Sequence, residues 1–195
     1  MPILLRQPGA TLALVVPLLL LSWLGMMIVH ESGHIVLAWM TGGTVEKVVL
    51  HPLAISRTDV SPNPRPLAVV WGGPVMGVLV PLASWGIASW SVPGIAYLLR
   101  FFAGFCLVAN GLYLGIAPLD AVGDSRELLR LGASIWSLVL FGAISTGAGF
   151  LLWNRQGEHF GLGESPRPIP RAHIWGVASL LAVVFVAEML LSSSV

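Results

Sequence analysis

Long apolar runs separated by short polar segments make up most of this chain. An α-helix needs roughly 20 apolar residues to cross a bilayer. Runs of this kind lie at residues 11–40, 67–90, 95–117, 133–153 and 172–191. The pattern predicts an all-α integral membrane protein with about five transmembrane helices. Two pairs of small residues, Gly73 with Gly77 and Gly111 with Gly115, predict faces at which helices pack closely.

The segment between the first two runs has a different character. Residues 44–50 and 53–58 carry charged and β-branched side chains, and His51-Pro52 separates them. Short runs bounded by turn residues are typical of a hairpin. We therefore expect a short membrane-associated β-hairpin, whose exposed edge can pair with an extended peptide. An ordinary polar loop is the alternative.

Composition supports a membrane protein and excludes several other classes. The chain is 56% hydrophobic and 10% charged, whereas soluble domains carry about 25% charged residues. A net charge of +1 offers no basic surface for nucleic acid. Cys106 is the single cysteine, which rules out an internal disulfide and a thiolate metal site. We expect one membrane domain over residues 1–195, multi-pass in the lipid bilayer of a prokaryotic cytoplasmic membrane.

A polar cluster stands inside the first apolar run. His30 and His34 are four residues apart, so on a helix they share a face and can bind one ion, with Glu31 beside it. A charge at the bilayer centre costs about 2.5–3.5 kcal/mol, which favours a functional site over polar groups that only link neighbouring helices. Zinc suits imidazole and carboxylate ligands, and a catalytic zinc keeps three protein ligands. The third ligand must come from elsewhere in the chain.

Two further motifs follow, Gly72-Gly73-Pro74 and then Asn110 with Pro118-Leu119-Asp120. Together with His30-Glu31-Ser32-Gly33-His34, they resemble the motifs of the site-2 protease family of intramembrane zinc metalloproteases. The resemblance covers residues 10–131 and implies a three-helix catalytic core there. Residues 132–195 would then add two further transmembrane helices.

The resemblance also implies roles for individual residues. His30, His34 and an aspartate would hold Zn²⁺, and Glu31 would activate water and pass its proton to the leaving amine. Asn110 would help to hold the substrate strand or the oxyanion, with a helix–helix hydrogen bond as the equal alternative. The implied enzyme is a zinc metalloendopeptidase that cuts in or near a transmembrane segment of a membrane-protein substrate, as in regulated intramembrane proteolysis.

The third motif departs from the family pattern. Ala121 stands where the family has Gly, and Tyr113 stands where it has Pro. Asp120 is the favoured third ligand. Asp124 is the alternative, because residues 123–128 resemble the Asp-Gly-x-Arg-x-Leu form often found in relatives, and this second alignment makes Asp124 the ligand. Asp124 is also the expected N-cap of a short helix. Because of these departures, a second function stays open, that of a non-catalytic relative acting as a membrane binding or assembly subunit. A homo-oligomer or an accessory membrane partner is compatible with both functions.

Overall fold

The computed structural model describes residues 8–192, which are mostly helical. The helices are α1 (Pro8–Met40), α2 (Pro66–Ser91), α3 (Ala96–Gly115), α4 (Gly123–Arg130), α5 (Ile135–Trp153), the 3-10 helix η1 (Gly157–Phe160) and α6 (Arg171–Ser192). Among these residues, five helices, all except α4 and η1, are long and apolar enough to cross a membrane. The predicted all-α membrane fold is therefore confirmed. Residues 1–7 and 193–195 of the expected membrane domain lie outside the described residues.

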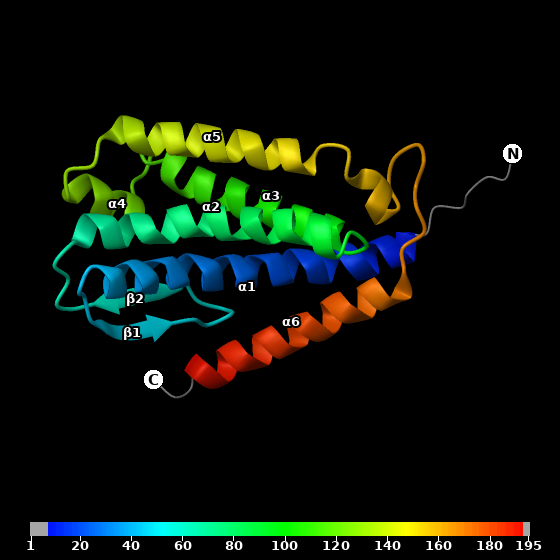
Figure 1. Cartoon of the computed structure of the whole chain (residues 1–195), viewed down its shortest axis with the longest axis horizontal. Coiled ribbons are helices and arrows are strands. Elements are labelled where there is room, and N and C mark those ends of the chain that lie inside the picture. The colour runs from blue at the N-terminus through cyan, green and yellow to red at the C-terminus, as the bar shows by residue number, and fades with distance from the viewer. Residues whose placement is uncertain (1–7, 193–195) are drawn as a thin grey trace, which may run out of the picture.

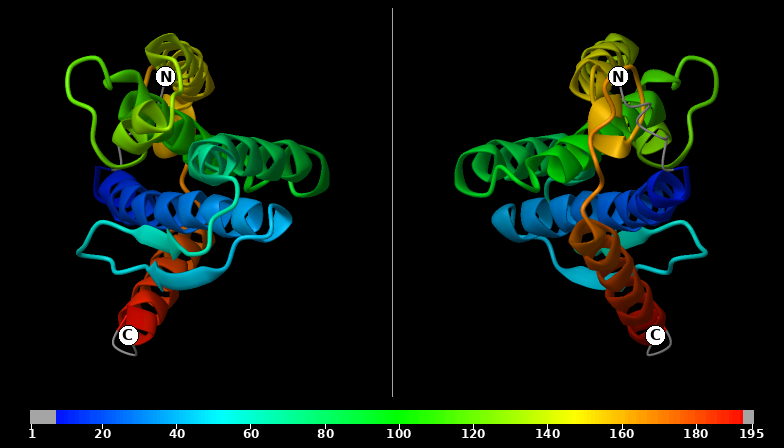
Figure 2. Two further views of the ribbon diagram at one scale, coloured as in Figure 1. Left: turned by 90° about the vertical axis from the view of Figure 1, so that its left-hand side faces the viewer. Right: turned by 90° about the vertical axis from the view of Figure 1, so that its right-hand side faces the viewer.

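The long helices pack side by side in the order α5, α3, α2, α1, α6 (Figures 1 and 2). α6 contacts the side of α1 that lies away from α2, and it diverges from α1 toward its own C-terminal end (Figure 1). Most of the apolar surface of α6 is exposed, as expected for a helix that faces lipid. The centre of the molecule is therefore formed by α1, α2 and α3.

Glycines allow the central helices to touch. A Cβ atom on Gly33 would overlap the backbone carbonyl of Gly72, so α1 and α2 meet backbone to backbone at that point. Gly111 of α3 makes the same kind of contact with Gly142 of α5, which confirms the predicted close packing of α3. Gly77 of α2 differs from the prediction, because it faces the side chain of Asn110 rather than a neighbouring backbone.

The predicted hairpin is present, with a shorter second strand than expected. β1 (Val45–Val49) pairs antiparallel with β2 (Arg57–Val60), and both lie along the C-terminal half of α1 (Figure 1). Between them, the Ala54 N–H bonds to the His51 carbonyl (3.0 Å) and turns the chain. The expected strand over residues 53–58 was therefore wrong at its start, because its first residues belong to this turn.

The short helix α4 begins without the cap that the sequence predicts. Val122 occupies the N-cap position, and its N–H donates to the hydroxyl of Ser125 (3.0 Å). Asp124 is the second residue of α4, so the prediction that it is the N-cap was wrong. Its side chain is consequently free to point away from α4 toward α1.

Candidate metal centre

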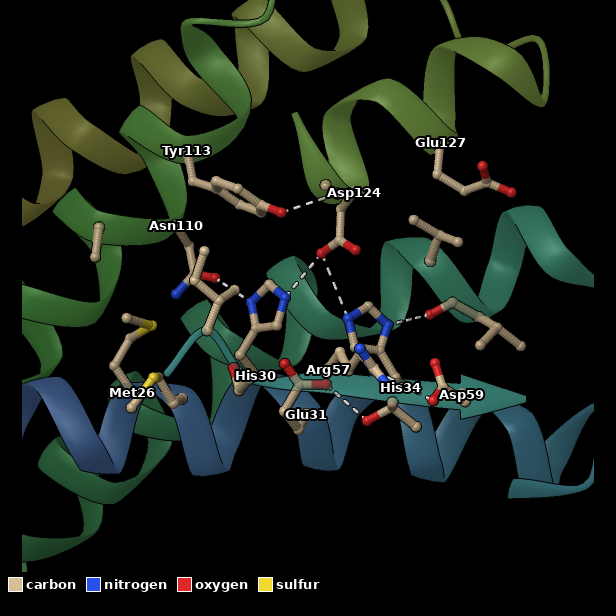
Figure 3. A pocket seen from close by; sticks show the side chains of 18 of the residues that line it. Met26, His30, Glu31, His34, Arg57, Asp59, Asn110, Tyr113, Asp124 and Glu127 are labelled. Atoms are coloured by element: carbon tan, nitrogen blue, oxygen red, sulfur yellow. Dashed lines mark hydrogen bonds and ion pairs between the residues drawn. The ribbon is translucent and has the colours of Figure 1, made fainter. Parts of the chain in front are cut away.

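A cavity of about 830 Å³ lies beside the C-terminal half of α1. Its walls come from α1, α2, α3, α4 and the hairpin (Figure 3). The lining residues fall between Trp23 and Glu127, and no described residue of α5 or α6 is among them. The cavity is thus built by the stretch that carries the three motifs.

Three side chains from two helices converge on one point in this cavity (Figure 3). The Oδ2 atom of Asp124 lies 2.8 Å from Nε2 of His30 and 3.4 Å from Nε2 of His34. The histidines are 8% and 7% exposed. His30 and His34 therefore share one face of α1, as their spacing of four residues predicts. On that side, α4 supplies the carboxylate of Asp124.

Hydrogen bonds at the far side of each ring fix which nitrogen faces this point. Nδ1 of His30 lies 2.7 Å from Oδ1 of Asn110, and Nδ1 of His34 lies 2.8 Å from the carbonyl oxygen of Val69. Both oxygens only accept hydrogen bonds, so each Nδ1 carries a proton and Nε2 is the nitrogen of each ring that can bind a metal ion. Anchoring of this kind is usual for histidines that bind metals.

The converging atoms are two imidazole nitrogens and one carboxylate oxygen. The Oδ2 of Asp124 only accepts hydrogen bonds, so each Nε2 beside it pairs with it through a proton or through a shared cation. The ligand atoms of His30, Glu31 and His34 also lie within 4.8 Å of one another, a spacing at which they can hold a metal ion. Two imidazoles and carboxylate oxygens make up a donor set that suits zinc. The residues therefore fit the ion that the sequence resemblance implies.

Asp124 is ionised in this environment. Burial alone would raise the pKa of its carboxyl, but the contacts with His30 and His34 outweigh burial and hold the pKa well below its usual range. The side chain is 20% exposed at the edge of the cavity. Asp124 therefore brings a negative charge to the two histidines.

Asp120 lies apart from this group. The turn that follows α3 continues past Ile116, whose carbonyl accepts the N–H of Asp120 (3.1 Å). The residue is exposed, and it is not among the cavity's lining residues. Of the two aspartates considered as the third ligand, the structure brings Asp124, and not the favoured Asp120, to the histidines.

Glu31 lies beside the histidines and is held by the hairpin. Its side chain is 3% exposed, and Oε2 accepts a hydrogen bond from the hydroxyl of Thr58 in β2 (2.6 Å). Within residues 8–192, its other oxygen, Oε1, accepts no protein hydrogen bond. The carboxylate thus has one oxygen fixed and one oxygen available.

Asn110 supports the site through His30. Its Oδ1 accepts from His30, and its Nδ2 donates to the carbonyl of Cys106 (2.9 Å). The amide is 2% exposed. Both ends of the side chain are engaged, and the bond to His30 is a helix–helix hydrogen bond of the kind given as the alternative. The contact with substrate stays a prediction.

Glycines of α2 leave the space that these side chains fill. A Cβ on Gly73 would overlap Nε2 of His34 and lie 2.7 Å from Nε2 of His30. A Cβ on Gly77 would lie 2.7 Å from both amide atoms of Asn110. The Gly72-Gly73-Pro74 motif is thus part of the site itself, and only a residue without a side chain fits at position 73.

Three further groups that sequence reasoning missed take part in the site. They are the Val69 carbonyl, the Thr58 hydroxyl and the Tyr113 hydroxyl, which accepts a hydrogen bond from the N–H of Asp124 (2.8 Å). Tyr113 had a signal, because it stands where the resembled motif has proline. The other two had none, since each contact joins segments far apart in the sequence.

Comparisons with protein-family models, with curated proteins and with solved structures find no match to this chain.

Proposed function

We propose that this chain is an intramembrane zinc metalloendopeptidase that hydrolyses a peptide bond in or near a transmembrane segment of another membrane protein. The observation that carries the proposal is the convergence of His30, His34 and Asp124 on one point beside the buried carboxylate of Glu31. The resemblance of three motifs to the site-2 protease family supports the same activity.

A zinc ion bound in this site would polarise a substrate carbonyl and lower the pKa of a bound water to about 7. Nε2 of His30, Nε2 of His34 and Oδ2 of Asp124 would hold it. Asn110 and the Val69 carbonyl keep the two rings in orientation through their Nδ1–H groups. The chain therefore provides both the ligands and the hydrogen bonds that orient them.

Glu31 moves the proton. Its free Oε1 takes a proton from the water as the water oxygen attacks the peptide carbonyl carbon. The same carboxyl then gives the proton to the amide nitrogen as the C–N bond breaks. Thr58 fixes the other oxygen through its hydroxyl, so the base keeps one orientation through both transfers.

The cavity suits an extended apolar segment. Apolar side chains make up much of its lining, including Trp23, Met26, Met27, Leu112 and Ile116. β2 also borders the cavity, and in this two-stranded sheet it has one partner strand. Its second edge offers main-chain groups that can pair with an extended peptide. A substrate helix could thus be bound as a strand once it unwinds.

The test is cleavage by the Glu31→Gln variant of the full-length protein in detergent micelles, with a synthetic transmembrane-helix peptide as substrate and zinc content measured in parallel. Removing a general base typically lowers the rate by about 10²–10⁴-fold, and the zinc should stay bound. Glu188→Gln is the matched control, because Glu188 is 2% exposed and lies on α6, away from the cavity. Undiminished cleavage by Glu31→Gln would contradict the proposal.

A further inference from the structure

One side chain ties the first turn of α4 to α3. The first N–H groups of a helix have no acceptor within the helix, and the N-cap residue Val122 has no side-chain acceptor to offer. The hydroxyl of Tyr113, near the end of α3, accepts the N–H of Asp124 at 2.8 Å. Tyr113 therefore caps α4 from another helix, at the residue whose carboxylate faces the histidines.

The fit around this hydroxyl is close. Gly123 has a φ of +50°, and a Cβ on it would overlap the Tyr113 hydroxyl. The ring of Tyr113 packs against an apolar cluster that contains Leu114 and Leu128, and it meets the His30 ring edge-on with centroids 6.0 Å apart. Packing thus holds the ring, and its hydroxyl reaches the turn.

The hydrogen bond acts on the position of a carboxylate. Aspartate has a short side chain, so its oxygens follow the backbone closely. Holding the N–H of Asp124 therefore holds its Oδ2 at 2.8 Å from His30 and 3.4 Å from His34. Figure 3 shows Tyr113, Asp124 and the two histidines in this arrangement.

The same contact joins two departures from the resembled motif. Tyr113 stands in the place of a proline, and the aspartate at the histidines is Asp124 instead of Asp120. The turn after α3 carries Asp120 away from the site, and the chain returns at Gly123. A tyrosine at position 113 is long enough to meet the chain at that return.

We infer that Tyr113 is a positioning residue of the metal centre, whose hydroxyl holds the first turn of α4 so that Asp124 completes the ligand set of His30 and His34. The inference rests on the zinc site of the proposed function. Groups that orient metal ligands typically change metal affinity by about 10–100-fold when they are removed.

The experiment measures zinc affinity by chelator competition on the full chain in detergent, with Tyr113→Phe as the variant. Phenylalanine keeps the packed ring and removes only the hydroxyl, so zinc affinity should fall by about 10–100-fold. Tyr97→Phe is the matched control. Tyr97 is the chain's other tyrosine, lies on the same helix and makes a 2.8 Å bond to His173 outside the cavity. Its variant should bind zinc as the wild type does.

A double-mutant cycle separates positioning from a general structural role. If Tyr113 acts through Asp124, then Tyr113→Phe should cause no further loss of zinc affinity in the Asp124→Ala background. A Tyr113→Phe protein that binds zinc like the wild type would overturn the inference while the proposed function stands. So would a loss of equal size in both backgrounds. A wild-type protein that takes up no zinc would overturn the proposed function and the inference with it.

Discussion

Two histidine clusters lie toward the two ends of α3, and each contains two histidines and one of the chain's two tyrosines. The site cluster consists of His30, His34, Tyr113 and Asp124. The remote cluster consists of His159, His173, Tyr97 and Glu158. At a rise of about 1.5 Å per residue, the two tyrosines are separated by roughly 24 Å along the helix.

The two clusters differ in how their rings are directed. In the remote cluster, His159 stacks flat on Tyr97 with centroids 4.9 Å apart, and Nδ1 of His173 lies 2.8 Å from the Tyr97 hydroxyl. Glu158 pairs with Arg167 at 3.7 Å rather than with a histidine. Burial and the charge of Arg167 lower the pKa of His159, so this region disfavours added positive charge.

In the site cluster, by contrast, each Nδ1 is bound to an acceptor and each Nε2 faces a shared carboxylate. The comparison teaches that the number of histidines does not distinguish a candidate metal site. The direction of the rings does, and here it is set by the groups behind them, the Asn110 amide and the Val69 carbonyl. The remote histidines instead fasten η1 and α6 to α3.

Replacing one histidine in each cluster should give the largest contrast. His30→Ala removes a proposed ligand. Loss of a group that only orients a ligand lowers metal affinity by up to about 100-fold, so loss of the ligand itself should lower zinc affinity by more than that. His159→Ala should leave zinc affinity unchanged, because its ring stacks on Tyr97 and faces no shared anion. Chelator competition measures both. Equal losses in the two variants would remove the distinction between the clusters.

Filling the space beneath the site rings should have the next largest effect. Gly73→Ala adds a methyl group that overlaps Nε2 of His34 and shifts the ring, so zinc affinity should fall by about 10–100-fold, the size typical when a ligand loses its orientation. Gly86→Ala on the same helix is the control, since a Cβ there meets nothing within 4 Å. Thermal unfolding in detergent shows whether both variants fold. Unchanged zinc affinity in a folded Gly73→Ala protein would contradict the packing described at the site.

Loss of the hydrogen bond to the base should have the smallest effect. Thr58→Val keeps the shape of the side chain and removes the donor to Glu31. Cleavage should slow by about tenfold, or ~1.4 kcal/mol in the barrier, with zinc content unchanged. Thr58→Ser keeps the hydroxyl and should restore the rate. A serine variant as slow as the valine variant would show that the hydroxyl does not act on Glu31.

The long helices could be predicted from the sequence because membrane spans depend on a local property, about 20 apolar residues in a row. The facing of His30 and His34 was predictable for the same reason, since their relation is set by one helix. The predicted bounds of α1 and α2 differ from the observed ones by only a few residues. The spans and the shared face of His30 and His34 could thus be predicted without the structure, because both depend on a single helix.

The loop residues could not be placed in this way. The choice between Asp120 and Asp124 depends on where the chain turns after α3, and that turn is set by the contact of Ile116 with Asp120 and by the positive φ of Gly123. Thr58 reaches Glu31 only because β2 packs along α1. These are contacts between distant segments, and hydrophobic periodicity carries no information about them.

The central claim is that His30, His34 and Asp124 hold one metal ion beside Glu31. It is tested most directly by the zinc content per chain of the purified protein, measured for the wild type, Asp124→Ala and Asp120→Ala after the same dialysis. We predict about one zinc in the wild type and in Asp120→Ala, and a clear loss in Asp124→Ala. Full zinc content in Asp124→Ala, or a loss in Asp120→Ala instead, would contradict the account.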